Sequence, residues 1–381
     1  MALPGYRKAW AAPSRWFEFV ETLLQSIRTL TAELGRPVQF MEVCGTHTMC
    51  AFRSGLRSLL PETVKLLSGP GCPVCVTPAG FVDFAIAIAR QPGTTVATFG
   101  DMVRVPGTES SLERARAGGA TVRVVYSPMD ALAEAEQHTD RRIVFLGIGF
   151  ETTAPGVAWT IREAARRGLK NYSVLSAHKL IPPAMDALLR SGNVRVDGFL
   201  CPGHVSVIIG ARAYEFVCER YRIPCVVAGF EAQDMAGAMA MLLRQLCRGE
   251  CRVENEYLRT VGADGNREAL AVVAEVFEPC DTAWRGLGTI QASGLRIRAA
   301  YRAHDAAEAF GGLPLPAPVE PAGCLCGEVL CGLRTPPECP LFASRCTPDT
   351  PVGSCMVSSE GTCAAHYRYG RPLKSGADKS P

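Results

Sequence analysis

The sequence has few aromatic residues, no excess of charge of one sign and no long hydrophobic run. Aromatic residues make up 7% of the 381 residues, and the formal net charge is +3 with basic and acidic residues interspersed. The chain therefore lacks the basic stripe that a nucleic-acid backbone requires. Its apolar runs, such as residues 84–89, are much shorter than the roughly 20 residues that cross a bilayer. Because no basic-then-apolar leader follows Met1 either, we expect a cytoplasmic protein.

A phosphate-binding loop is also missing, whereas cysteine is abundant. The chain contains no Gly-x4-Gly-Lys-Ser/Thr segment, so any nucleotide chemistry would have to be unconventional. It contains 17 cysteines. Because a reducing compartment prevents cysteines from forming a permanent disulfide framework, we expect them to bind metal or to perform thiol chemistry.

Short β-rich segments alternate with helix-like segments through the first two thirds of the chain. The expected strands are residues 38–43, 64–67, 94–99, 121–126, 142–148, 172–176, 196–200 and 225–228. This alternation predicts an α/β fold with parallel sheets flanked by helices, and the number of strands indicates two such units. Residues 14–33 predict a packing helix that ends at Gly35, and residues 311–321 predict an extended, proline-rich linker.

Polar residues follow several of the expected strands. In open α/β sheets, ligands bind beyond the carboxyl ends of the strands, and two facing sheets could enclose a cleft there. Side chains at these positions could relay protons or orient ligands, although each could also be a turn or capping residue. The residues concerned are Asp101, Glu151, His178, His204 and Glu231.

The last part of the chain is rich in cysteine and too poor in apolar residues to form a core of its own. Seven cysteines lie between residues 324 and 363. Four of them, separated by 12, 6 and 16 residues, are Cys326, Cys339, Cys346 and Cys363. Four thiolates can hold tetrahedral zinc or a cubane iron-sulfur cluster, and the scattered spacing favours the cluster. The other three, which leave the choice of ligands open, are Cys324, Cys331 and Cys355.

Cys72 and Cys75 have the Cys-x2-Cys spacing, which allows a disulfide or a shared metal ion. They follow Gly69-Pro-Gly71, where the glycines let the backbone approach a ligand closely, and a helix-like run begins near Ala79. A thiol pair near the start of a helix has a lowered pKa and can carry two electrons. The alternative is half of a zinc site.

The segment Cys44-Gly-Thr-His-Thr48 directly follows an expected strand. The thiolate of Cys44 and the imidazole of His47 could both reach one transition-metal ion, such as iron, copper or zinc. The hydroxyls of Thr46 and Thr48 could then donate hydrogen bonds to other ligands of that metal. The alternative is a turn at the end of a strand in which His47 bonds only to the backbone.

Five motifs taken together resemble the HypD family of hydrogenase maturation factors. They are Cys44-Gly-Thr-His-Thr48, Gly71-Cys-Pro-Val-Cys75, Gly149-Phe-Glu-Thr-Thr153, Pro202-Gly-His-Val205 and the Cys-x12-Cys-x6-Cys-x16-Cys tail. They occur in the order typical of the family and span nearly the whole chain.

The resemblance implies a cytoplasmic scaffold on which the Fe(CN)2CO unit of [NiFe] hydrogenase is assembled, with the small chaperone HypC and the cyanide donor HypE as partners. It implies that Cys44 binds the iron with His47 close by, and that Cys72 and Cys75 form a redox-active pair. The four tail cysteines, Cys326, Cys339, Cys346 and Cys363, would hold a [4Fe-4S] cluster. Glu151 and His204, which lie in two of the motifs, are expected to take part in the chemistry.

The resemblance also implies three domains, two of them related α/β units around a central cleft. On this basis we expect the first unit in residues 36–140 and the second in residues 141–246. The third, mixed domain would combine residues 1–35 with residues 247–381 and would carry the cysteine tail.

Two other classes of protein remain as alternatives. A free-standing iron-sulfur thiol-disulfide oxidoreductase would use Cys72 and Cys75 and would not need Cys44. A zinc-stapled binding module would be colourless, whereas a cluster would make the protein brown.

Overall fold

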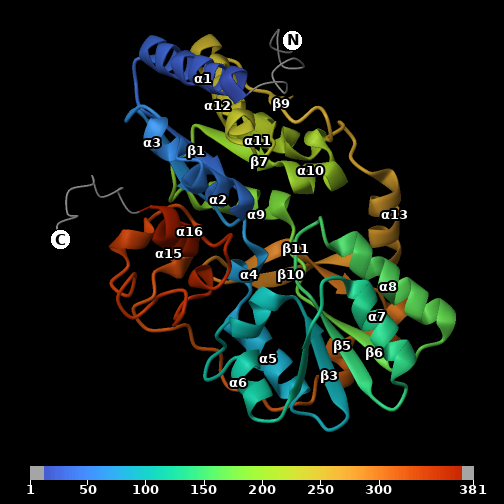
Figure 1. The fold of residues 1–381 in the computed structure, drawn as a ribbon. Coiled ribbons are helices and arrows are strands. Elements are labelled where there is room, and N and C mark those ends of the chain that lie inside the picture. The colour runs from blue at the N-terminus through green and yellow to red at the C-terminus, as the bar shows by residue number, and fades with distance from the viewer. Residues whose placement is uncertain (1–12, 371–381) are drawn as a thin grey trace.

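The computed structural model describes residues 13–370 and contains two parallel sheets and one antiparallel hairpin (Figure 1). Sheet A contains, in spatial order, β2 (Val64–Ser68), β1 (Val38–Glu42), β7 (Gly198–Pro202), β8 (Cys225–Ala228) and β9 (Val253–Asn255). Sheet B contains β4 (Thr121–Val124), β3 (Thr94–Thr98), β5 (Arg142–Gly147) and β6 (Tyr172–Ser176). The hairpin joins β10 (Phe277–Trp284) to β11 (Gly288–Ile297). The start of the chain, where we expect no leader, lies outside the described residues.

The helices cover the sheets and connect their strands. The α-helices are α1 (Pro13–Leu34), α2 (Gly45–Arg53), α3 (Leu56–Leu59), α4 (Pro73–Val76), α5 (Ala79–Ala89), α6 (Leu112–Ala117), α7 (Pro128–Gln137), α8 (Ala154–Arg167), α9 (Ile181–Ser191), α10 (Gly203–Ile209), α11 (Glu215–Tyr221), α12 (Ala232–Arg248), α13 (Arg267–Val276), α14 (Ala306–Phe310), α15 (Cys326–Leu330) and α16 (Thr362–Tyr369). The 3₁₀ helices are η2 (Gly100–Arg104), η3 (Ala211–Tyr214), η4 (Ala299–His304), η5 (Pro336–Glu338) and η6 (Ser354–Met356). Within residues 13–370, no helix has both the length and the apolar character needed to cross a membrane.

The two parallel sheets confirm the predicted α/β class. The central strands β3, β7 and β8 are buried along their whole length, because helices cover both faces of the sheets. Each of the eight strands expected from the sequence is present, and β9 adds a short edge strand to sheet A. The predicted N-terminal helix is α1, which packs against α12 and is followed by Gly35 in the left-handed conformation.

The strands are distributed between the sheets differently from the expected domain ranges. The chain leaves sheet A after β2, builds sheet B from β3 to β6, and returns to sheet A at β7, which pairs with β1. Each sheet therefore takes strands from both 36–140 and 141–246, and the expected boundary near residue 140 does not separate them. Residues 247–381 are divided as well, because β9 extends sheet A while α13 packs against α8 beside sheet B. Hydrophobic alternation marks the strands, but it carries no information about which distant strands pair.

The cysteine tail packs between the two halves of the molecule. In Figure 1 its helices α15 and α16 lie beside α4, at the side of the molecule between the two sheets. Helix α16 packs against α2, and η6 packs against α4. Five of the seven tail cysteines share one buried apolar cluster with Cys72 and Cys75 and with strands β7 and β8; they are Cys326, Cys331, Cys346, Cys355 and Cys363. The tail is therefore part of a core built from distant segments of the chain.

Candidate functional site

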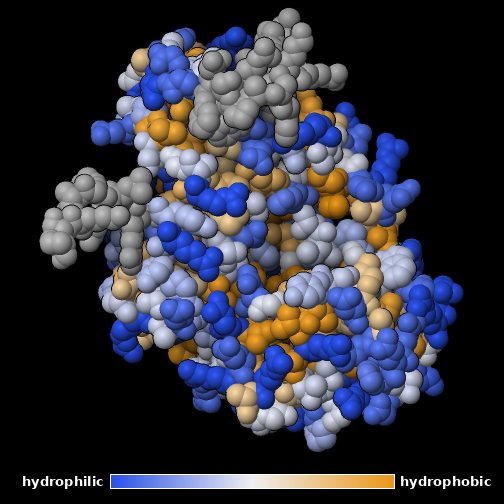
Figure 2. Space-filling view, viewed as in Figure 1, coloured by the Kyte–Doolittle hydropathy of each residue, from blue (hydrophilic) through white to orange (hydrophobic). Residues whose placement is uncertain are grey.

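A cavity of about 240 Å³ lies where the loops at the strand ends of both sheets meet. Sheet A contributes residues that follow β1, β2 and β7, and sheet B contributes residues that follow β3 and β5. The polar or sulfur-containing side chains in the lining are those of Cys44, Thr46, Met102, Thr152, Thr153, His204 and Glu360. Figure 2 shows hydrophobic residues gathered below the middle of the face that it draws. The sequence predicts ligand-binding loops at these strand ends, and the cavity lies among them.

The loop that carries Cys44 packs directly on the loop that carries Cys72. The backbone N–H of Gly45 donates a hydrogen bond to the carbonyl oxygen of Gly71 at 2.8 Å. Gly71 lies so close to Cys44 that a Cβ atom at position 71 would overlap the backbone of Cys44. Two backbones can approach this closely only where one residue has no Cβ atom, which means glycine. Gly71 is therefore the residue that allows the two cysteine loops to meet.

Replacing Gly71 with alanine is expected to destabilise the protein by about 1 to 3 kcal/mol, because the added methyl group must push the Cys44 loop aside. The urea concentration at the midpoint of unfolding measures this effect. Gly312→Ala is a matched control, since a Cβ atom at position 312 meets nothing within 4 Å. Equal midpoints for the two variants would contradict the packing argument.

Cys44 is buried at the edge of the cavity and precedes the first turn of α2. Burial raises the pKa of its thiol to about 12, and the nearby carboxylate of Glu360 adds to the rise. Hydrogen bonds from the backbone of His47 and from Thr46 act in the opposite direction and lower this pKa. A thiol with such a pKa stays protonated at neutral pH unless a metal ion displaces the proton.

His47 is fully buried and bonds to the backbone. Its Nε2 atom lies 2.9 Å from the carbonyl oxygen of Gly229 and 3.2 Å from that of Ala228. Nε2 must therefore carry the proton, which makes Nδ1 the lone-pair nitrogen. Nδ1 is buried and has no hydrogen-bond partner among the described residues. Burial lowers the pKa of His47 to about 4, so the ring is neutral.

The two threonines expected to act as donors differ in position. Thr46 lines the cavity, and its hydroxyl donates to Glu360 Oε1 at 2.6 Å. Thr48 is buried, and its hydroxyl lies 3.3 Å from Ser68 Oγ and 3.4 Å from the carbonyl oxygen of Cys44. Thr46 is therefore the threonine of this loop whose side chain borders the cavity.

Cys72 and Cys75 form a disulfide around the short helix α4. Their exposed fractions are 3% and 0%, and the bond faces the apolar cluster shared with the tail. The two residues between them, Pro73 and Val74, line the cavity instead. Cys72 caps α4, where its Sγ accepts a hydrogen bond from the backbone N–H of Cys75. The disulfide therefore lies behind the cavity wall, on the side of the tail.

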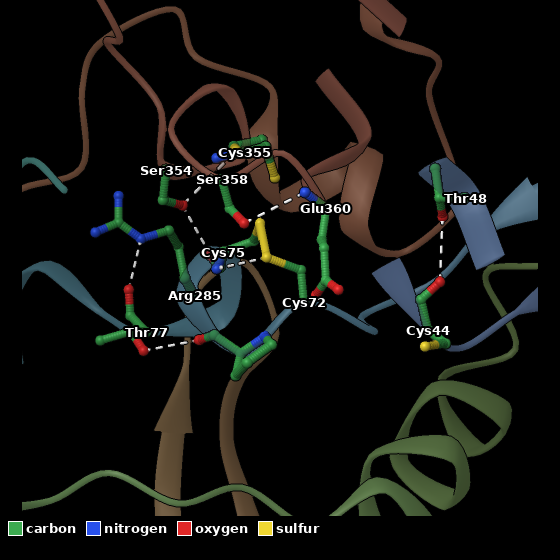
Figure 3. The surroundings of a disulfide bond; sticks show 12 residues. Cys44, Thr48, Cys72, Cys75, Thr77, Arg285, Ser354, Cys355, Ser358 and Glu360 are labelled. Carbon is green, nitrogen blue, oxygen red and sulfur yellow. Dashed lines mark hydrogen bonds between the residues drawn. A yellow bond between two sulfur atoms is a disulfide. The ribbon is translucent and has the colours of Figure 1, made fainter. Parts of the chain in front are cut away.

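Arg285, in the turn of the β10–β11 hairpin, hydrogen-bonds to the end of α4 and the residue that follows it. Its backbone N–H donates to the carbonyl oxygen of Val76, and its Nε donates to that of Thr77 at 2.9 Å (Figure 3). The side chain is buried and forms an ion pair with Glu320 of the expected linker. Residues 311–321 contain no helix or strand, as expected for a linker.

The tail segment around η6 contacts both the disulfide and the tail cysteines. Ser354 Oγ donates a hydrogen bond to the carbonyl oxygen of Cys75 at 2.8 Å and lies 4.0 Å from Cys326 Sγ. The backbone N–H of Cys355 donates to Cys326 Sγ at 3.3 Å. One serine therefore connects the disulfide to a tail thiol.

The four tail cysteines singled out by their spacing are all buried. Hydrogen bonds from Cys326 and Cys355 lower the pKa of Cys363, which favours the thiolate that binds metal. Cys346 Sγ accepts a hydrogen bond from the backbone N–H of Val352 at 3.4 Å. Within residues 13–370, no three thiol, imidazole or carboxylate groups are arranged as ligands of a single metal ion. In a cubane cluster each thiolate binds a different iron atom, so its ligands lie further apart than those of one ion.

Glu360 is the cavity residue that sequence reasoning missed. It comes from the tail, between η6 and α16, yet it lines the cavity and bonds to Thr46. Its Cβ and carbonyl oxygen also pack against Gly45. In Figure 3 its side chain extends between the Cys72–Cys75 disulfide and Cys44. A contact between residues more than 300 positions apart leaves no local sequence signal.

Glu151 does not line the cavity, although its neighbours Phe150 and Thr152 do. Its Oε1 atom accepts a hydrogen bond at 2.9 Å from the backbone N–H of Ile181, the first residue of α9. Its Oε2 atom is buried without a hydrogen-bond partner among the described residues. Burial raises the pKa of Glu151 to about 7.

Replacing Glu151 with glutamine is expected to change the pH dependence of stability. Because the pKa of about 7 exceeds the ordinary value of 4.5, the folded state keeps a proton that the unfolded state releases. The wild type therefore loses stability as the pH rises from about 4.5 through 7. Glutamine keeps the acceptor for Ile181 without titrating. Between pH 5 and pH 8, the variant should gain about 2 to 3 kcal/mol relative to the wild type in urea unfolding. A pH-independent difference would contradict this account.

His204 lines the cavity and stacks on Phe230, with the ring centroids 3.7 Å apart. Phe230 also contacts the ring of His47 at 4.9 Å. Partial burial lowers the pKa of His204, and the carboxylate of Glu360 opposes this effect. The two histidines are therefore positioned by one phenylalanine that the sequence analysis did not single out.

Three other polar candidates lie outside the cavity lining. Asp101 is exposed in the first turn of η2, and Glu231 is the N-cap residue of α12. His178 is buried, with Nδ1 3.1 Å from Ser176 Oγ, and burial lowers its pKa to about 3. Asp101 lies in a helical turn and Glu231 caps a helix, which matches the alternative interpretation of these two residues.

Comparison with known proteins identifies relatives along nearly the whole chain. The family model HypD, described as "Hydrogenase formation hypA family", matches residues 18–370. The hydrogenase maturation factor HypD of Rhodobacter capsulatus is 49% identical over 356 residues, which cover 91% of this chain and 94% of that protein. HypD of Cupriavidus necator is 49% identical over 348 residues, covering 89% and 92% of the two chains. HypD of Escherichia coli is 44% identical over 363 residues, covering 94% and 96%.

These matches include the Cys44 loop, the Cys72–Cys75 segment and the cysteine tail, which together border the cavity and the core behind it. The chain belongs to the HypD family of hydrogenase maturation factors.

Proposed function

We propose that this protein is a cytoplasmic scaffold on which the Fe(CN)2CO unit of [NiFe] hydrogenase is assembled, together with a HypC-type small chaperone and a HypE-type cyanide donor. The observation that carries the proposal is a continuous series of contacts. Cys44 borders the cavity, its loop contacts Gly71 beside Cys72, and Ser354 links Cys75 to Cys326. The thiol of Cys44, a disulfide and a group of tail thiols are thus neighbours in space.

Cys44 is the proposed iron ligand. Cyanide and carbon monoxide are strong-field ligands that require an electron-rich, low-spin iron, and a thiolate supplies electron density while leaving coordination positions open. The cavity beside Cys44 has room for the diatomic ligands, and the small chaperone would supply further protein ligands. The hydroxyl of Thr46 borders the same space and is the proposed hydrogen-bond partner of a cyanide nitrogen.

His47 is proposed to act close to the iron. Its lone-pair nitrogen Nδ1 has no other partner among the described residues, and its Nε2 is anchored on Gly229. This anchoring fixes the tautomer, as the outer hydrogen bond of a ligating histidine commonly does. His204 and Glu360, which line the same cavity as Thr46, are proposed to orient ligands there.

The tail is proposed to hold a [4Fe-4S] cluster on Cys326, Cys339, Cys346 and Cys363. The donor set is suitable, because the four thiols are buried and hydrogen bonds favour the thiolate of Cys363. Such a cluster transfers single electrons. The neighbouring Cys72–Cys75 disulfide takes up two electrons and two protons when it becomes a dithiol, and we propose that it passes reducing equivalents to the Cys44 site.

The two alternatives fit less well. A thiol-disulfide oxidoreductase acting on protein substrates needs an accessible disulfide, whereas Cys72 and Cys75 are 3% and 0% exposed. A zinc-stapled binding module gives no role to the cavity that Cys44 borders.

Infrared spectroscopy of the chain co-purified anaerobically with its small partner tests the proposal. Bands from iron-bound cyanide and carbonyl would support the scaffold role. A visible absorption band together with iron and inorganic sulfide would support the cluster. A colourless complex with zinc and without these infrared bands would overturn the proposal in favour of the binding module.

A further inference from the structure

The tail contains more thiols near one another than a four-ligand cluster needs. A Cβ atom built on Gly353 would lie 2.7 Å from Cys324 Sγ and 3.3 Å from Cys326 Sγ. Both sulfurs therefore lie beside the same glycine. Cys346 approaches the same backbone, since its Sγ accepts a hydrogen bond at 3.4 Å from the N–H of Val352, the residue directly before Gly353. Cys324 thus lies near two of the four expected ligands, Cys326 and Cys346.

Cys339, another expected ligand, lies beside the backbone that leads into Cys324. Its Sγ is 3.8 Å from the carbonyl oxygen of Gly323, the residue directly before Cys324. Cys324 and Cys339 are therefore neighbours in the tail. Either could complete a set of four with the other three cysteines.

We propose that Cys324 is a fifth thiol able to bind the tail cluster and that it can replace Cys339 as a ligand. This inference rests on the proposed function, because it assumes that the tail holds a cluster. In the exchange, the bond between iron and Cys339 Sγ breaks and the Cys339 thiolate takes up one proton from solvent, while the thiol of Cys324 releases one proton to solvent and its thiolate binds the iron. One thiolate replaces another, so the number of ligands and the charge of the site stay the same. The chain thereby keeps its cluster when Cys339 does not bind it.

The other two extra thiols serve as controls because they lie elsewhere. Cys331 Sγ lies 3.9 Å from the carbonyl oxygen of Gly286, at the hairpin turn. Cys355 lies within η6, where its backbone N–H donates to Cys326 Sγ at 3.3 Å. Neither is placed beside Gly323 as Cys339 is.

The test measures iron, inorganic sulfide and the visible absorption of anaerobically purified full-length variants. Alanine is used because serine could itself bind iron. Cys339→Ala should keep at least half of the wild-type cluster, and Cys324→Ala should keep all of it. The double variant C324A/C339A should lose the cluster, whereas C331A/C339A and C339A/C355A should match Cys339→Ala. If Cys339→Ala is insoluble, Cys339→Val takes its place, and failure of both to hold a cluster counts against the proposal.

Each other outcome also decides the question. Loss of the cluster in Cys339→Ala alone, or its retention in C324A/C339A, overturns the proposal, because Cys324 would then not be the replacement. Loss in Cys324→Ala alone would make Cys324 an obligatory ligand and would also overturn it. Loss in C331A/C339A or in C339A/C355A would assign the replacement to another thiol. A wild-type protein without iron and sulfide would instead overturn the proposed cluster itself.

Discussion

Replacing Cys44 with serine is expected to lower the amount of iron-bound cyanide and carbonyl on the protein by more than about 100-fold, since even loss of an outer-shell partner costs 10- to 100-fold in metal affinity. Serine is nearly isosteric, so the contacts with Gly71 and Thr46 remain possible. Its hydroxyl, however, is a harder and much less acidic donor than the thiol and does not supply the electron density that a low-spin iron requires. Infrared spectra of the variant co-purified with the small partner measure the loss.

Cys50 provides the matched control for this experiment. It has the same exposed fraction as Cys44, 8%, and lies within α2, but it belongs to the apolar core between α2 and sheet A. Cys50→Ser should therefore keep both infrared bands. Undiminished bands in Cys44→Ser would show that another residue holds the iron, and the scaffold proposal would lose its central ligand.

Local sequence signals account for much of the fold. The strands were predictable because each combines β-branched or apolar residues with a following glycine- or proline-rich loop, as in the segment from Val38 to Gly45. Sheet membership was not predictable. β1 pairs with β7 although about 160 residues separate them, and no pattern within either strand specifies that partner. Because local sequence does not specify which strands pair, the domain ranges expected from the sequence are contiguous.

The candidate site shows the same limit. Cys44, Thr46 and His204 border the cavity as their positions after strands suggested, because the carboxyl ends of parallel strands meet at one edge of a sheet. Glu360 and Phe230 could not be found in this way, since their contacts with Thr46 and with the two histidines depend on tertiary packing. The contact of Glu151 with the first residue of α9 could not be predicted either, because the sequence around a glutamate that follows a strand does not specify which helix it will contact.

Replacing Cys75 with alanine is expected to abolish hydrogenase maturation in cells while leaving the visible spectrum of the tail cluster unchanged. The disulfide cannot form, so the proposed route for reducing equivalents to the Cys44 site is broken. The link to the tail survives, because Ser354 bonds to the backbone carbonyl of Cys75 and alanine keeps that carbonyl. Hydrogenase activity of cell extracts should fall to background, and the absorption spectrum and iron content of the purified variant should equal those of the wild type.

Cys201→Ala separates this redox role from a loss of packing. Cys201 is fully buried in β7 and belongs to the same apolar cluster as the disulfide. Its replacement removes a sulfur atom from the same core and should leave hydrogenase activity intact. If Cys75→Ala loses the cluster spectrum as well as activity, the disulfide acts as a structural support of the tail, because the two sites share one core and collapse together. If Cys75→Ala keeps full activity, reducing equivalents do not pass through the pair, and the contact made by Ser354 serves only to fasten the tail to α4.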